Sequence, residues 1–179
     1  MAKTYTLHVA GLTRELPICK INDHLDIAAF IMFSDVELTI ACAKALLEKC
    51  LDFDVILTAE AKGIPLAYEM SRQSGKQWIP ARKGVKGYMA DPVIVEDQSI
   101  TTAGKQTLVI DKKDLDYMNG KRILVVDDVI STGGSLHALD ALAARSSGTI
   151  VAQAAVLAEG DAAERKDIIF LEPLPLFAH

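Results

Sequence analysis

The sequence Ile123-Leu-Val-Val-Asp-Asp-Val-Ile-Ser-Thr-Gly-Gly-Ser135 joins an apolar run to a Gly-containing turn. Residues 123–126 are apolar without alternation, which is typical of a strand buried on both faces of a parallel sheet. The turn that follows leads into a helical pattern that carries Leu136, Leu139 and Leu142. Because strands that alternate with helices form parallel sheets with right-handed crossovers, the sequence predicts an α/β domain.

The residues that precede this stretch have the same order of elements. Residues 55–58 (Val-Ile-Leu-Thr) form a second apolar run without alternation, and residues 78–81 (Trp-Ile-Pro-Ala) form a further predicted strand. Between them, Pro65 and Gly75 stand where the first turn and the C-terminal boundary of a helix are expected. These segments predict one more strand-helix-strand unit of the same sheet.

Weaker patterns complete the expected fold. Loose alternation in residues 5–19 predicts a hairpin, and residues 93–95 with 107–110 predict a long hairpin with a flexible tip. Ser34 and Glu37 have the spacing of a capping box at the start of a helix. The positions of that helix expected to face the sheet are Val36, Ile40, Ala43 and Leu47. The remaining predicted elements are a strand at 149–157, a helical turn at 161–164 and a strand at 168–171.

The composition is that of a single folded domain. The chain has 179 residues, of which 50% are hydrophobic and 24% charged, and this excludes disordered and fibrous proteins. Its net charge of -5 argues against a general nucleic-acid binder or a membrane-surface binder. The cations are nevertheless concentrated, since residues 62–86 hold six Lys and Arg against one Glu. This segment is therefore suited to a small polyanion.

The cysteines and the apolar segments indicate a reducing compartment. Cys19, Cys42 and Cys50 form neither an even set nor a Cys-x-x-Cys pair, so no disulfide framework and no zinc site is predicted. The chain opens without a charged and then apolar leader, and no apolar stretch reaches the roughly 20 residues of a spanning helix. We therefore expect a cytoplasmic protein that does not engage a membrane.

The turn at residues 131–135 carries the groups that a phosphate needs. Gly133 and Gly134 allow close approach of the backbone, Thr132 and Ser135 offer hydroxyls, and the helix N-terminus that follows favours an anion. The spacings of a nucleotide P-loop and of a dinucleotide-binding fingerprint are both missing. The turn therefore predicts a phosphate site of another kind.

Asp127 and Asp128 follow the predicted strand, at the edge where open α/β sheets bind ligands. Their carboxylates suit sugar hydroxyls or the water shell of Mg²⁺. The alternative is that both only cap the helix, but adjacent carboxylates repel each other and would then need compensating donors. Together with the turn, they predict binding of a phosphorylated sugar with a metal ion.

Residues 125–135 resemble the phosphoribosyl pyrophosphate (PRPP) motif of type I phosphoribosyltransferases, and the Thr-Gly-Gly form is most similar to that of adenine-type members. The resemblance implies a Rossmann-like parallel sheet with helices on both faces, a flexible hairpin loop and a small hood. It implies a single domain over residues 1–179. Within it, the hood covers about residues 1–33 with a C-terminal contribution, and the core covers about residues 34–171.

This resemblance also implies an activity. Enzymes of this family transfer 5-phosphoribosyl from PRPP to a base, here a purine and adenine first, and release pyrophosphate. The implied cofactor is Mg²⁺, the implied partners are PRPP and a purine base, and the implied assembly is a homodimer without nucleic acid. Two alternatives stay open: a transferase for xanthine, hypoxanthine or guanine, and a PRPP-sensing regulator without turnover.

Residue roles follow from the same resemblance. The expected catalytic residues are Asp127, Asp128, Arg82 and Lys83, and the acidic pair would also hold the metal. The expected PRPP-binding residues are the acidic pair with Ser131, Thr132, Gly133, Gly134 and Ser135. The expected pyrophosphate-binding residues are Glu60, Ala61, Lys62, Gly63, Arg82, Lys83, Lys86 and Lys105. The expected base-binding residues are Phe30, Ile31, Val129 and Glu159.

Some of these residues fit a second role equally well. Lys86 and Lys105 have the character of solvated surface lysines. Phe30 beside Ile31 suits a core as well as a purine, and Glu159 suits an exposed turn.

The sequence departs from the adenine-type pattern at one place. Those members carry a Glu shortly before a Gly-Lys in the flexible loop, whereas here residues 101–103 (Thr-Thr-Ala) precede Gly104 and Lys105. Glu96 and Asp97, on the other arm of the predicted hairpin, are candidate substitutes or solvated loop charges.

Overall fold

The computed structural model describes residues 3–50, 52–97 and 106–179. Its centre is a five-stranded sheet in which all neighbouring strands are parallel. In spatial order the strands are β10 (Ile169–Leu174), β9 (Thr149–Glu159), β8 (Arg122–Ile130), β4 (Val55–Ala59) and β5 (Gln77–Ala81). The stretch that opens with Ile123 thus lies in the central strand, as its apolar sequence predicts.

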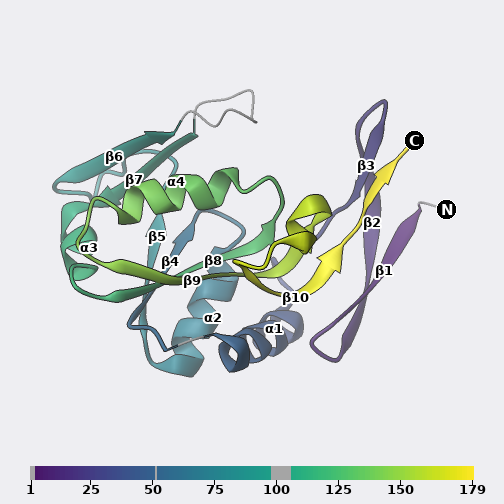
Figure 1. The fold of residues 1–179 in the computed structure, drawn as a ribbon, viewed down its shortest axis with the longest axis horizontal. Helices are drawn as coiled ribbons and strands as arrows, with labels where there is room; N and C mark the ends of the chain where they lie inside the picture. The colour runs from purple at the N-terminus through teal and green to yellow at the C-terminus, as the bar shows by residue number, and fades with distance from the viewer. Residues whose placement is uncertain (1–2, 51, 98–105) are drawn as a thin grey trace.

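Helices cover both faces of this sheet (Figure 1). Ile123 and Val125 of β8 pack in one apolar cluster with α3 (Lys112–Tyr117) and α4 (Gly134–Ala143). Leu124 and Val126 point the other way, into a second cluster with α1 (Val36–Lys49) and α2 (Ile64–Ser74). Successive residues of a strand face opposite sides of its sheet, so one short apolar run supplies both cores.

A second, antiparallel sheet stands at one end of the molecule (Figure 1). We call it the hood; it contains β1 (Thr4–Val9), β2 (Leu12–Asn22), β3 (Leu25–Ala28) and β11 (Leu176–Ala178). The predicted hairpin forms its first two strands, whereas β3 and β11 were not predicted. Between β9 and β10 lies the short 3-10 helix η1 (Gly160–Glu164), at the predicted helical turn.

The hairpin of β6 (Pro92–Asp97) and β7 (Gln106–Asp111) lies at the opposite end of the molecule (Figure 1). It confirms the predicted long hairpin, whose tip at 98–105 lies outside the described residues. In the part of the chain that the structure describes, no helix is both long and apolar enough to span a membrane.

The start of α1 differs from the prediction. Asp35, rather than Ser34, is the N-cap, and its carboxylate accepts a hydrogen bond from the Leu38 N–H. Ser34 has φ of +67° and lies outside the helix. The capping-box prediction was therefore wrong by one position, because Asp is as good a cap as Ser and the sequence offers both.

The buried face of α1 differs in part from the prediction. Ala43 is buried and Leu47 is partly buried, as predicted, whereas Val36 is 67% exposed and Ile40 42% exposed. The other buried apolar positions are Leu38, Cys42 and Leu46. The apolar stripes that start at Val36 and at Leu38 both recur at helical spacing, so periodicity alone does not distinguish them. The contacts of α1 with the sheet and with α2 favour the stripe that starts at Leu38.

Several strands continue past their predicted ends, β8 and β10 among them. β8 includes Asp127 and Asp128, which were predicted to lie in a loop, and runs to Ile130 beside β9. β10 continues through Pro173, which the structure tolerates because β10 is an edge strand. The other edge strand, β5, contains Pro80.

Gly148, just before β9, is a position where the surrounding atoms leave no room for a side chain. A Cβ atom there would lie 2.5 Å from the Met118 carbonyl oxygen and 2.7 Å from Ile123 Cδ1. We expect Gly148→Ala to lower the free energy of unfolding by about 1–3 kcal/mol, because the backbone carbonyl cannot turn away. Urea denaturation measures the change. Gly84→Ala is the control, since nothing lies within 4 Å of its added Cβ, and equal losses in both variants would contradict the prediction.

Candidate active site

A cleft of about 860 Å³ opens at the carboxyl ends of β4, β8 and β9. Ligands of open α/β sheets bind at this edge. The opposite wall comes from residues 27–31, at the end of β3 and in the segment that leads to α1. The cleft thus lies between the central sheet and the hood.

A smaller pocket of about 180 Å³ is formed by the turn between β8 and α4. It shares Asp127, Val129, Ser131 and Ser135 with the large cleft, and the rest of its lining is Ile130, Thr132, Gly133, Gly134 and Leu136. Gly133 has φ of +83°, a conformation that a residue without a Cβ adopts without strain. The pocket therefore faces the N-terminus of α4, where unpaired N–H groups and the helix dipole favour an anion.

The acidic pair lies where the large cleft and the small pocket meet. Asp127 lines both, and one of its oxygens accepts a hydrogen bond from the Asp128 N–H at 2.8 Å. Asp128 is 2% exposed, and its Oδ2 lies 3.0 Å from Lys62 Nζ. Burial, and then the neighbouring Asp128 carboxylate, raise the pKa of Asp127 well above its usual value. Lys62 offsets only part of this effect.

The loop after β4 approaches the acidic pair closely. A Cβ atom on Gly63 would lie 3.2 Å from Asp127 Oδ1 and would collide with the Thr58 hydroxyl. Glycine at this position therefore allows the loop of Glu60, Ala61 and Lys62 to line the cleft. The peptide bond between Glu60 and Ala61 is cis.

Glu60 contacts the cationic residues that follow β5. Its carboxylate accepts hydrogen bonds from Arg82 Nε at 2.7 Å and from the Lys83 N–H, and Lys86 Nζ lies 3.9 Å away. Partial burial opposes ionisation, but these donors hold the pKa of Glu60 below its usual value. Arg82 Nη1 also donates to the Tyr88 hydroxyl at 2.7 Å. Lys83 lines the large cleft, whereas Arg82 does not line it.

The residues expected at a base lie on both walls of the large cleft. Phe30, Ile31, Val129 and Glu159 all line it. Phe30 is 4% exposed and packs in the core cluster of α1 and α2, so its side chain also has the packing role that its sequence allows. Partial burial raises the pKa of Glu159, and Lys62 opposes this rise. Lys105 lies outside the described residues.

Arg165, which follows η1, is a residue that the sequence reasoning missed. A Cβ on Gly133 would lie 3.2 Å from Arg165 Nη1, so this guanidinium lies against the turn between β8 and α4. Asp167 holds it with two hydrogen bonds of 2.9 and 2.7 Å. No motif joins Arg165 to the turn in sequence; the only signal is its place after the carboxyl end of β9, which adjoins β8.

Comparisons with known proteins point to one family. A family model described as the phosphoribosyl transferase domain matches residues 35–172. The adenine phosphoribosyltransferase of Malacoplasma penetrans is 31% identical over 106 residues, which cover 59% of each chain. That of Chlorobium phaeovibrioides is 32% identical over 111 residues, which cover 62% of this chain and 60% of the relative. The chain thus spans about three fifths of the length of these relatives.

Solved structures share the fold. Adenine phosphoribosyltransferase from Thermoanaerobacter pseudethanolicus has a TM-score of 0.67 and 22% identity, and covers 79% of this chain and 84% of its own. The enzyme from Giardia lamblia, complexed with 9-deazaadenine, has a TM-score of 0.65 and 16% identity, and covers 95% and 93%. These similarities confirm the predicted fold class of a parallel sheet with helices on both faces.

The raised pKa of Asp127 predicts that this carboxylate lowers the free energy of unfolding of the free protein at neutral and higher pH. A carboxyl whose pKa is higher in the folded than in the unfolded state destabilises the fold once the pH exceeds the unfolded value. We expect Asp127→Asn to raise the free energy of unfolding by roughly 1–2 kcal/mol at about pH 8, and to lose this gain toward about pH 4. Urea denaturation at the two pH values measures it. Asp23→Asn, on an exposed turn, is the control. A gain that does not depend on pH would contradict the prediction.

Proposed function

Because this chain belongs to the phosphoribosyl transferase domain family, we propose that it transfers 5-phosphoribosyl from PRPP to a purine base, with adenine as the preferred base. The products are the nucleoside monophosphate and pyrophosphate. One observation carries the proposal: the acidic pair at the end of β8 adjoins an anion pocket at the N-terminus of α4. A ribose that carries a 5'-phosphate requires this combination of acceptors and donors.

Two groups of residues hold the phosphorylated ribose in this proposal. The turn from Ser131 to Ser135 binds the 5'-phosphate in the small pocket, through N–H groups and hydroxyls. Asp127 and Asp128 accept hydrogen bonds from the ribose 2' and 3' hydroxyls. In the transition state, positive charge develops on the ribose ring, and the two carboxylates stabilise it where they already lie.

The diphosphate of PRPP binds on the other side of the acidic pair, at the loop of Glu60, Ala61, Lys62 and Gly63. Lys62 and Lys83 line the cleft there and are its first cations. Arg82 and Lys86 are paired with Glu60 in the free protein, so this carboxylate competes with phosphate oxygens for both cations. Lys105 is the last of the proposed diphosphate-binding cations.

The cofactor in this proposal is Mg²⁺, and the residues fit it. Among the described residues, no group of three or more His, Cys, Asp or Glu side chains is arranged to hold a metal ion. Mg²⁺ characteristically uses one or two protein carboxylates and takes its other ligands from substrate phosphates and water. Asp127 and Asp128 supply that number at the mouth of an anion pocket. When bound, the ion neutralises charge on the departing diphosphate.

The base binds between the hood-side wall and the end of β9. Phe30, Ile31 and Val129 offer apolar surface to a purine ring, and Glu159 offers the polar group that reaches its edge. The choice of adenine is supported by the curated relatives, which are named adenine phosphoribosyltransferases. It is also supported by the 9-deazaadenine complex of the Giardia lamblia enzyme.

We further expect a cytoplasmic homodimer. Val36 and Ile40 on α1 and Tyr68 on α2 are large apolar side chains that the structure leaves exposed, on two helices that contact each other. Exposed apolar side chains on adjoining elements suit an interface with a second copy. Light scattering coupled to size exclusion measures the assembly.

One observation favours a second candidate, a PRPP-sensing regulator. The acidic residue of the adenine-type loop is absent, and Thr101, Thr102 and Ala103 stand in its place. These residues lie outside the described part of the chain. A protein that keeps the ribose and phosphate sites without this acid retains PRPP binding and loses proton transfer at the base.

A pyrophosphate-release assay tests the proposed function directly. The protein is incubated with PRPP, Mg²⁺ and one of adenine, hypoxanthine, guanine, xanthine or orotate. We expect release with adenine above all others. No release with any base, together with measurable PRPP binding, would replace the enzyme with the regulator, and preferred release with another base would correct the substrate.

The acidic pair is tested by substitution. Asp127→Asn and Asp128→Asn should each lower the rate by roughly 100- to 1,000-fold, since each removes a charge that the transition state needs. Calorimetry should show no PRPP binding to the double variant. Asp52→Asn, an exposed carboxylate paired with Arg122, is the matched control and should behave as the unsubstituted protein. Unchanged PRPP affinity in the double variant would rule out the site.

A further inference from the structure

The segment of residues 29–34, whose residues 29–31 line the cleft, is held to the hood strand β2 at both ends. At its start, the Ala29 N–H donates to the Pro17 carbonyl of β2 at 2.9 Å. At its end, the segment meets Asp35, the N-cap of α1, which Arg14 of β2 binds. One strand therefore fixes both ends of the segment that lines the proposed base site.

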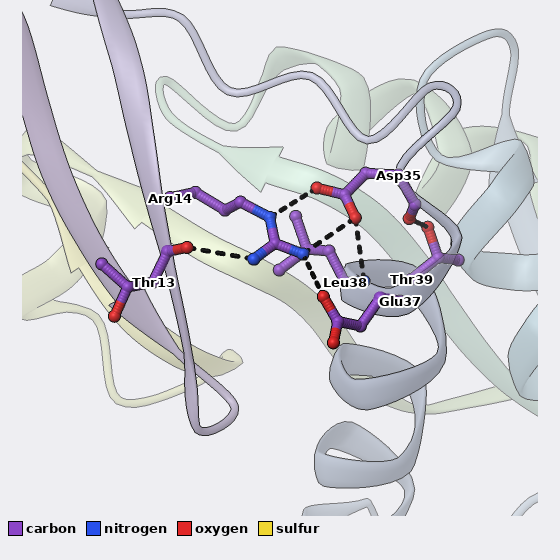
Figure 2. Close-up of polar contacts among 6 residues, drawn as sticks. All are labelled: Thr13, Arg14, Asp35, Glu37, Leu38 and Thr39. Atoms are coloured by element: carbon purple, nitrogen blue, oxygen red, sulfur yellow. Dashed lines mark hydrogen bonds and ion pairs between the residues drawn. The ribbon is translucent and has the colours of Figure 1, made fainter.

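The contact between Arg14 and Asp35 is bidentate: the guanidinium binds both carboxylate oxygens at once (Figure 2). Arg14 Nε donates to Asp35 Oδ2 at 2.7 Å, and Nη2 donates to Oδ1 at 3.1 Å. Nη2 also donates to Glu37 at 2.8 Å, and Nη1 donates to the Thr13 carbonyl oxygen at 3.0 Å. Because the guanidinium is planar and holds two oxygens at once, it fixes the direction of the carboxylate as well as its distance.

Asp35 in turn is hydrogen-bonded to α1 and to the 29–34 segment. Its Oδ1 accepts the Leu38 N–H at 3.1 Å, and its own N–H donates to the Met32 carbonyl oxygen at 3.1 Å. A shift of the Asp35 carboxylate would therefore move the first turn of α1 together with the end of the 29–34 segment. Arg14 and Asp35 are each 27% exposed, so solvent only partly screens the pair.

Apolar packing also joins the hood to α1. Leu7, Val9 and Leu16 of the hood are buried in the same apolar cluster as Leu38 and Leu46 of α1. This packing attaches the hood to the core without Arg14. Apolar contacts are non-directional, however, and they leave the position of the segment less defined than a bidentate contact does.

We propose that Arg14 is a positioning residue for the base: it joins β2 to the N-cap of α1 and so sets residues 29–34 against the cleft. The inference rests on the proposed function for the identity of the ligand. Its structural part, the placement of the segment, stands apart from any activity. The acidic pair and the phosphate turn lie on the other wall, so Arg14 acts on the base and not on PRPP.

Steady-state kinetics of Arg14→Ala and Arg14→Lys separate the two substrates. We expect the KM for adenine to rise about tenfold in Arg14→Ala, with the KM for PRPP changed less than about twofold. Arg14→Lys keeps the positive charge but cannot form the bidentate contact. We expect its KM for adenine to lie between those of Arg14→Ala and the unsubstituted protein. Equal rises in both KM values, or no rise in either, would overturn the proposal.

Hydrogen exchange of the free protein gives a readout that needs no turnover. Amides of residues 29–34 should exchange faster in Arg14→Ala, while those of β8 keep their protection. Lys20→Ala is the matched control, because it removes an ion pair of 2.7 Å with Asp23 that lies within the hood. If no base reacts, the proposed function fails, yet faster exchange of 29–34 alone still supports positioning. Unchanged exchange there, or faster exchange throughout the chain, would overturn it.

Discussion

Two carboxyl groups, Asp127 and Asp128, are held side by side at the end of the central strand, and much of the site is arranged around their mutual repulsion. Lys62 neutralises one of them, and Gly63 gives the loop that carries Lys62 room to approach. The pair opens on the N–H groups of the turn before α4. The free protein thus maintains an arrangement that is unfavourable by itself, as is common where a site is organised in advance for a charged ligand.

The central strand makes this arrangement possible. Alternate side chains of β8 enter the two apolar clusters, so that the strand is fixed from both faces and by β4 and β9 at its sides. A carboxyl end anchored in this way cannot relax to separate two like charges. Cationic side chains lie around it instead. Lys62, on the loop after β4, pairs with Asp128, and Glu60 on the same loop pairs with Arg82 and Lys86, which follow β5.

The sequence predicts the parts of the molecule whose causes are local. Buried strands, the helix bounded by Pro65 and Gly75, and the turn between β8 and α4 each depend on residues that adjoin along the chain. The buried face of α1 is not predictable in this way, because Val36 and Leu38 start equally good apolar stripes. Pairings between distant segments are likewise missed: β11 with β3, Arg14 with Asp35, and Arg165 with Gly133 leave no periodicity in the sequence.

Pro80 and Pro173 occupy the two outermost strands of the parallel sheet. A proline lacks the N–H with which an edge would bond a further strand, so each proline interrupts the row of donors along its border. At the end of β5 the backbone of Arg82 already pairs with Val109 of β7. Partially unfolded copies are thereby hindered from joining sheet to sheet into aggregates.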